Sequence, residues 1–146
     1  RPFYLNVSLS HPHDPYVTPQ RHWDQYEHSE IDLPKVPFIP LEDRDSYSAW
    51  TYRHYDRGEY DIQEADIRNA RHAYYGNVSY IDALLGQILD TLDRIGVRNN
   101  TIIVLCADHG DMLGERGQWY KMTPFENSTR IPLIINHPFI KIFFYE

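Results

Sequence analysis

The sequence predicts an α/β fold in which a mostly parallel sheet is flanked by helices. Two short apolar runs rich in β-forming residues, 3–9 and 102–107, are separated by one long segment with helical periodicity, 61–95. A strand, a crossover helix and a second strand form a βαβ unit, whose strands run parallel with a right-handed connection. With 146 residues, 42% of them hydrophobic, the chain is long enough to bury a core.

The first apolar run, Phe3–Leu9, is expected to form a core strand that ends at the prolines of the next loop. That loop carries His11 and His13. Ligands of open α/β sheets bind just outside the carboxyl ends of the strands, so these histidines are candidate binding groups. The alternative is that both are ordinary surface histidines.

Residues 17–60 predict a long surface excursion with extended pieces. Repeated prolines within 33–40 exclude a helix and a central strand there, and residues 20–26 are expected to form a short helix. An irregular stretch of this length is typical of segments that line a site or an interface. Its aromatic residues either pack the excursion down, which is favoured for each singly, or form a wall for a quaternary ammonium. They are Trp50, Tyr52, Tyr55 and Tyr60.

The long helix is expected to begin at a capping-box pattern over 61–64 and to end at Gly96 as a left-handed cap. Its apolar residues recur in steps of three, four and seven, which places one stripe against the sheet. The length allows a break near Gly76, and His72 is assigned to the helix surface. The stripe consists of Ile67, Ala70, Tyr74, Ile81, Leu85, Ile88, Leu92 and Ile95.

The second apolar run, 102–107, is continuous and short, which predicts a strand buried on both faces with Cys106 in the core. Its carboxyl end changes at once to Asp108 and His109. A carboxylate and an imidazole at this edge are candidate ligands for a divalent metal. The alternative is a polar turn in which Asp108 caps the next element.

The glycine-rich loop after this strand can return Lys121 to the same crevice, where its ammonium would meet an anion. Residues 130–135 are expected to form another short strand. The last residues, 139–145, are apolar but too few to span a membrane.

Composition excludes some functions. A net charge of −7 argues against a nucleic-acid surface, and no apolar run reaches membrane-spanning length. One cysteine allows no intramolecular disulfide, and nothing at the start resembles a signal peptide, so a cytoplasmic location is expected. The chain starts at Arg1 without a methionine and is expected to be a piece of a longer protein.

Three blocks of the sequence resemble the sulfatases, a family of the alkaline-phosphatase superfamily. They are 10–16, 74–82 and 108–122, the last beginning Asp-His-Gly-Asp-Met-Leu-Gly-Glu-Arg-Gly. The blocks occur in family order, and the resemblance runs from about residue 2 to residue 137. It is closest to the choline-sulfatase branch. The second block, with Tyr75 and Asp82, is interpreted as structural.

The resemblance implies an alkaline-phosphatase-like fold fragment from an enzyme that cleaves a sulfate monoester, with choline sulfate as the substrate of the closest branch. It implies that Asp108 and His109 are metal ligands. Lys121 would contact the sulfate and its bridging oxygen. His13 would bind the sulfate or act as an acid near the leaving group. Glu115 and the following Arg116 are interpreted as a surface ion pair.

The resemblance also implies cofactors. Calcium is the family default for the divalent metal and the first candidate here. Many members have Asn where this chain has His109, and a nitrogen ligand makes manganese an alternative, with magnesium as a further one. The family nucleophile is a hydrated formylglycine made within a Cys/Ser-x-Pro/Ala-x-Arg motif near the N-terminus. This sequence has no such motif. Cys106, followed by Ala-Asp-His, is not that residue.

We therefore expect residues 1–146 to be the central to C-terminal part of a sulfatase catalytic domain, truncated at both ends and inactive in isolation. Residues 17–60 would be an excursion within it, and the tail 136–146 departs from the family pattern. Two other functions stay open: a phosphonate or phosphate ester hydrolase of the same superfamily, and a truncated relative kept as a binding module. The expected partner is a small sulfate ester, and a second copy of the protein, in a homo-oligomer, is a further candidate.

Overall fold

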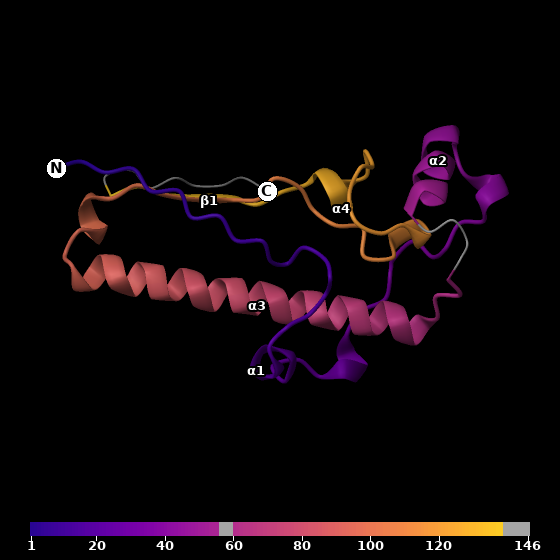
Figure 1. The fold of residues 1–146 in the computed structure, drawn as a ribbon, viewed down its shortest axis with the longest axis horizontal. Helices are drawn as coiled ribbons and strands as arrows, with labels where there is room; N and C mark the ends of the chain where they lie inside the picture. Colours follow the sequence, from indigo (N-terminus) through magenta and orange to yellow (C-terminus); the bar gives the residue numbers. More distant parts are fainter. Residues whose placement is uncertain (56–59, 139–146) are drawn as a thin grey trace.

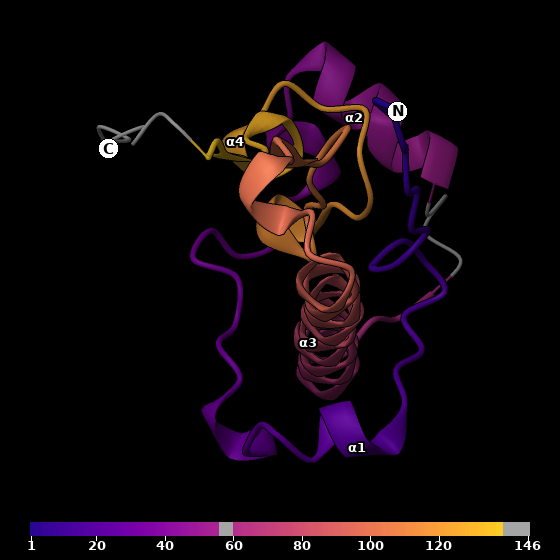
Figure 2. The ribbon, with the colours of Figure 1, turned by 90° about the vertical axis from the view of Figure 1, so that its left-hand side faces the viewer.

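A long helix, α3 (Glu64–Arg94), is the axis of the molecule. The structure is a computed structural model, and it describes residues 1–55 and 60–138. Two strands lie along one side of α3, while α1 (Gln20–Trp23) lies on the opposite side and α2 (Ser46–Tyr55) stands near its N-terminal end (Figure 1). Figure 2, which looks along α3, shows the excursion wrapping around the helix. The remaining elements are η1 (His28–Glu30), η2 (Leu41–Asp43), η3 (Arg98–Asn100), η4 (Glu115–Gly117) and α4 (Glu126–Thr129).

The sheet has two strands, β1 (Ile103–Cys106) and β2 (Leu133–Asn136). They pair antiparallel, with Ile103 opposite Asn136 and Cys106 opposite Leu133. The existence of both strands and the α/β class were predicted, and both are confirmed. The tail beyond residue 138 lies outside the described residues.

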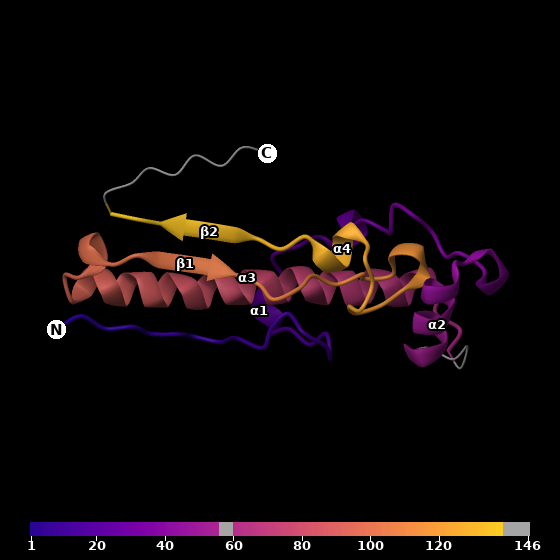
Figure 3. The ribbon, with the colours of Figure 1, turned by 90° about the horizontal axis from the view of Figure 1, so that it is seen from above.

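The segment Phe3–Leu9 differs from its prediction as a core strand. It runs in the direction of β1 on the side away from β2 (Figure 3), but it carries no strand assignment. Its apolar side chains are exposed, Tyr4 by 91%. A strand needs a hydrogen-bonded neighbour, and among the described residues this segment has none. The predicted parallel pairing is therefore not formed, and β1 instead has its ladder with β2.

β1 is not buried on both faces as predicted, because intermediate and exposed residues alternate along it. Val104 is 56% exposed. Cys106 is exposed as well, so its assignment to the core is wrong. Among residues 1–55 and 60–138, β1 pairs with one strand, β2, and no residue of β1 is fully buried.

α3 is continuous, and the predicted break near Gly76 is absent. Gly76 serves close packing instead, because a Cβ there would lie 2.8 Å from the Thr18 side chain. The capping box is two residues later than predicted, between Gln63 and Asp66. The cap at Gly96 is confirmed, with φ at +72°. No helix among residues 1–55 and 60–138 is long and apolar enough to cross a membrane.

His72 fastens the excursion to α3. It is 1% exposed, so its assignment to the helix surface is wrong. Its ring stacks on Trp23 at 3.6 Å between centroids, its Nε2 lies 2.9 Å from the Trp23 carbonyl, and its Nδ1 lies 2.8 Å from Nδ1 of His28. A carbonyl only accepts, so Nε2 carries the proton and Nδ1 accepts from His28. The apolar stripe predicted only the sheet-facing side of the helix.

Glu115 ties the loop after β1 to the excursion. It is buried, and its carboxylate accepts from the backbone N–H groups of Lys35 and Val36 at 3.0 Å each. Its charge partner is Arg71 of α3, at 3.8 Å. The predicted surface pair with Arg116 is wrong, because Glu115 is enclosed between two backbone segments and α3.

Replacing Glu115 with alanine is expected to destabilise the protein by about 3 kcal/mol, because it leaves a buried arginine without this partner and two amides without an acceptor. Urea unfolding of the polypeptide that carries this chain measures the effect. Glu30→Ala at an exposed position is the matched control and should change stability by less than about 0.5 kcal/mol. Equal effects of the two changes would contradict this account of Glu115.

Candidate active site

The side chains of His13 and His109, from two loops far apart in the sequence, meet at Lys121. Its Nζ lies 3.1 Å from Nε2 of His13 and 2.8 Å from Nε2 of His109. His13 belongs to the loop after the N-terminal segment, whereas His109 follows β1 at its carboxyl end. The structure thus brings together residues that the sequence placed at one edge.

The hydrogen bonds of the two imidazoles define their tautomers. Nδ1 of His13 donates to the carbonyl of Asp14 at 3.0 Å, and Nδ1 of His109 donates to the carbonyl of Gly110 at 2.7 Å. A neutral imidazole protonated at Nδ1 has a lone pair on Nε2. Both lone pairs therefore face the ammonium of Lys121. Among the described contacts, Lys121 uses two of its three N–H groups, which leaves one for an anion.

Asp108 lies beside this group on the loop after β1. Its side chain is 88% exposed, and its Oδ2 lies 3.4 Å from Nε2 of His109. A hydrogen bond from its own backbone amide lowers the pKa of the carboxyl, so it is ionised at neutral pH. No helix starts at this position, so the alternative of a helix cap finds no support.

Asp108 and His109 fit two positions of a divalent metal shell. The carboxylate and Nε2 of His109 lie close enough to share one ion, and the Nδ1–H bond to a carbonyl is the arrangement that orients metal-binding histidines. A metal at Nε2 would take the lone pair that faces Lys121 in this structure, so Lys121 would then keep its contact with His13 and have two N–H groups for an anion. Within the described ranges no group of three or more His, Cys, Asp or Glu could hold a metal. Calcium takes six to eight oxygen ligands, so further donors must complete such a shell.

A half-buried pair, Tyr16 and Asp111, connects the two loops. The hydroxyl of Tyr16 donates to Oδ2 of Asp111 at 2.9 Å. Burial raises the pKa of the Asp111 carboxyl. Burial and the neighbouring Asp111 charge likewise raise the pKa of the Tyr16 phenol, so it keeps its proton. Burial also raises the pKa of nearby Tyr74, to about 12.

The sequence did not predict the pairing of Tyr16 with Asp111, because the residues are 95 positions apart. The acidic residue two positions after His109 was visible as part of the polar edge, but it carried no signal of its partner. Gly110 was expected to allow a sharp turn. The structure adds that a Cβ there would lie 2.0 Å from the carbonyl oxygen of Asn127, so the loop approaches α4 closely.

The loop around His13 is hollowed next to the candidate site. This hollow gives a small molecule access to the imidazole edge. It is lined by Ser10, His11, His13, Asp14, Pro15 and Val17.

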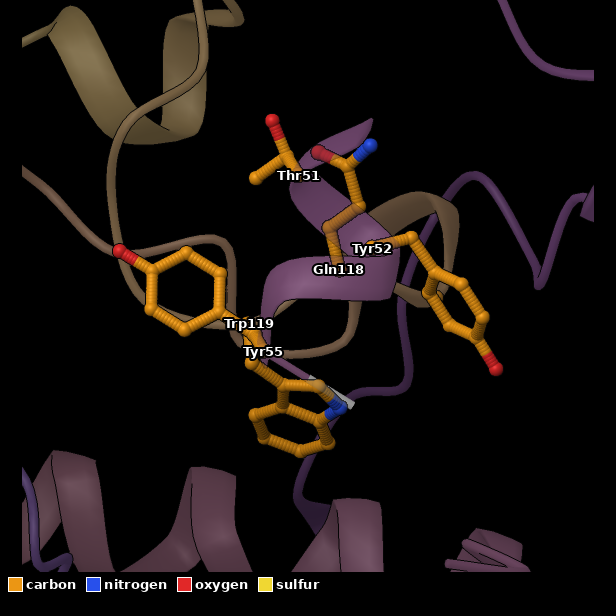
Figure 4. A pocket seen from close by; sticks show the side chains of 6 residues that line it. Thr51, Tyr52, Tyr55, Gln118 and Trp119 are labelled. Atoms are coloured by element: carbon orange, nitrogen blue, oxygen red, sulfur yellow. The ribbon is translucent and has the colours of Figure 1, made fainter. Parts of the chain in front are cut away.

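The excursion aromatics do not form one wall. Tyr52 and Tyr55 project to opposite sides of α2 at a small pocket that Gln118 and Trp119 also line (Figure 4). The ring of Tyr52 lies under the guanidinium of Arg44 at 4.4 Å. The ring of Tyr55 lies 5.3 Å from that of Tyr120. These contacts favour packing over a cation site. Trp50 stacks on His54, and Tyr60 is exposed.

Comparison with known proteins identifies relatives along almost the whole chain. The family model described as Sulfatase matches residues 1–141. A choline-sulfatase of Rhizobium meliloti (strain 1021) is 46% identical over 94% of this chain and 27% of its own length. An iduronate 2-sulfatase of Mus musculus is 33% identical, again over 94% of this chain and 27% of its own length.

A solved structure extends the comparison to the fold. A phosphonate monoester hydrolase from Silicibacter pomeroyi superposes with a TM-score of 0.77 at 28% identity, over 89% of this chain and 28% of that protein. The fold is therefore the alkaline-phosphatase-like fold that the resemblance implied. The chain spans little more than a quarter of the length of these proteins.

Proposed function

The chain belongs to the sulfatase family, and from this premise we propose that it forms the central to C-terminal part of a catalytic domain that cleaves a sulfate monoester. The observation that carries the proposal is the ammonium of Lys121 held between the Nε2 atoms of His13 and His109. A cation with a free N–H, beside an accessible hollow, suits one oxygen of a tetrahedral anion.

In the proposed reaction the oxygen of the nucleophile forms a new bond to sulfur as the S–O bond to the alcohol breaks, and the electron pair of the broken bond goes to the leaving oxygen. Lys121 contacts the sulfate and donates a proton to that oxygen. Because the Nε2 lone pair of His13 faces Lys121, His13 can take up or return the lysine proton, and once protonated at Nε2 it can donate a hydrogen bond to the sulfate. The nucleophile, expected to be formylglycine, comes from a part of the whole protein outside this sequence.

We assign Asp108 and His109 as two ligands of a divalent metal, with calcium as the first candidate and manganese or magnesium as alternatives. When bound, the metal neutralises negative charge on the sulfuryl oxygens. The ionised, exposed carboxylate and the oriented imidazole support the assignment. Their own contribution is to place a hard oxygen and a nitrogen donor 3.4 Å apart at the end of β1.

The similarity to a choline-sulfatase supports choline sulfate as the substrate. The candidate site binds the sulfate end, and the lining of the small pocket that Tyr52 and Tyr55 share includes none of the three residues of that site. We therefore propose that groups recognising the choline end come from the rest of the protein.

A second candidate function is hydrolysis of a phosphonate monoester, which is favoured by the structural similarity to a phosphonate monoester hydrolase. A phosphonate is also a tetrahedral anion, and Lys121 would bind it in the same way.

Steady-state assays of the full-length polypeptide on choline sulfate, an aryl sulfate and an aryl phosphonate monoester test the proposal. We expect the highest kcat/KM on a sulfate ester, with choline sulfate preferred over the aryl sulfate. The isolated 146-residue chain, which lacks a nucleophile motif, is the negative control. A preference for the phosphonate would select the second function, and turnover by the isolated chain would overturn the assignment of the nucleophile.

A further inference from the structure

We propose that the half-buried pair of Tyr16 and Asp111 positions Lys121 for the reaction. The inference rests on the proposed function for its kinetic test, but the geometry stands by itself. Neither residue makes a described hydrogen bond to Lys121 or to the two imidazoles. The pair therefore acts through the backbone and is a positioning device, not a catalytic one.

The carboxylate of Asp111 gathers donors from both loops of the site. Its Oδ2 accepts from the Tyr16 hydroxyl, and its Oδ1 accepts from the backbone N–H groups of Leu113 at 2.9 Å and Tyr120 at 3.1 Å. Tyr16 follows the histidine loop, and Tyr120 immediately precedes Lys121. One half-buried side chain thus fixes the spacing between the loop of His13 and the backbone that carries the ammonium.

The backbone around Lys121 needs such a hold. Tyr120 and Met122, on either side of it, have φ values of +63° and +69°. Residues other than glycine visit this left-handed region at a cost, and they persist there only when their surroundings fix them. The fixing contacts are backbone hydrogen bonds: the Tyr120 amide donates to Asp111. The Tyr120 carbonyl accepts from Met112 at 2.8 Å, and the Met122 carbonyl accepts from the Tyr47 hydroxyl at 2.9 Å.

The ring of Tyr16 is held as firmly as its hydroxyl. It lies 6.2 to 6.3 Å from the rings of Tyr74, Trp119 and Tyr120. The contact with Tyr74 of α3 anchors the pair to the longest helix of the molecule. The contact with Tyr74 thus fixes the position of Lys121 relative to α3.

Two replacements of Asp111 separate its role as a hydrogen-bond acceptor from the effect of its charge. In Asp111→Ala the Leu113 and Tyr120 amides lose their acceptor. In Asp111→Asn the one amide oxygen can still accept from both, and the NH₂ group can donate to the Tyr16 oxygen. We expect Asp111→Ala to lower kcat of the full-length polypeptide about 100-fold, with a smaller change in KM. Asp111→Asn should retain most of the activity, and Tyr16→Phe should fall between the two.

A double-mutant cycle with Lys121→Ala tells positioning from general destabilisation. If Asp111 acts through Lys121, then Asp111→Ala should have little further effect on kcat once the lysine side chain is gone. Tyr26→Phe is the matched control, because it removes a tyrosine hydroxyl that bonds Ser79 on α3, away from the site. It should leave kcat unchanged.

Amide hydrogen exchange over residues 113–122 provides a readout that does not depend on activity. Exchange should be faster in Asp111→Ala and close to wild type in Asp111→Asn. If the wild-type protein had no activity on any ester, the proposed function would be wrong. The exchange data would still test whether Asp111 holds the backbone around Lys121. Unchanged exchange and unchanged kcat in Asp111→Ala would overturn the positioning role, and so would equal losses of kcat with and without Lys121.

Discussion

Lys121→Ala in the full-length polypeptide is expected to lower kcat about 10²- to 10³-fold on a sulfate ester. The ammonium is the group that both Nε2 atoms face, and removal of one preorganised donor to a developing negative charge has an effect of this size. Lys121→Arg should recover only part of the loss, since a planar guanidinium cannot occupy the point between two imidazoles in the same way. Steady-state kinetics with the substrate at saturation measure the effect.

The control for Lys121 is Lys35→Ala, which removes an exposed lysine from the excursion and should leave kcat within the error of the assay. A further control is the leaving group. If Lys121 protonates the leaving oxygen, the loss in Lys121→Ala should shrink for esters of acidic phenols, whose oxygen needs little help. A loss that is equal for all leaving groups would remove the proton-donor role and leave only the binding role.

Substitution of the two candidate ligands is expected to reduce bound metal. Asp108→Ala and His109→Ala should each lower metal affinity by more than about 100-fold, because partners that merely orient ligands already account for 10- to 100-fold. His109→Asn exchanges a nitrogen donor for an oxygen donor. It should therefore strengthen the preference for calcium over manganese. Metal content after dialysis against each ion, followed by activity, measures both effects.

His54→Asn provides the control for the metal series, because His54 is an exposed histidine on α2 that stacks on Trp50. Its metal content should equal that of the wild type. Full metal content in both Asp108→Ala and His109→Ala would show that other residues hold the ion, and the assignment of these two ligands would then be wrong.

The site could be anticipated from the sequence because its residues follow strand-like runs directly. Asp108 and His109 come immediately after β1, and the position of a side chain at the end of a strand depends on local sequence. Lys121 was harder, since its return depends on a loop with several left-handed residues. A positive φ can be anticipated from the sequence at Gly114 and Gly117, because glycine adopts it readily, but not at Tyr120 and Met122.

The parts that escaped prediction depend on contacts between distant segments. His72 lies on the face of α3 that receives the excursion, and nothing in the periodicity of the helix indicates a second packed face. α2 was hidden because its aromatic and polar residues carry no apolar period. The sequence also could not show that Phe3–Leu9 lacks a strand partner among the described residues. β propensity indicates an extended backbone but not whether another strand pairs with it.

Phe3–Leu9 runs beside β1 without a hydrogen-bonded strand partner among the described residues, and this affects how the chain must be handled in solution. Extended segments with unpaired backbone N–H and C=O groups and exposed apolar side chains are templates for strand addition. Copies of the 146-residue chain are therefore expected to self-associate at high concentration. A fusion partner, or co-production with the remainder of the polypeptide, would shield these edges. Cys106, exposed at the end of β1, offers a thiol whose alkylation rate reports when shielding is complete.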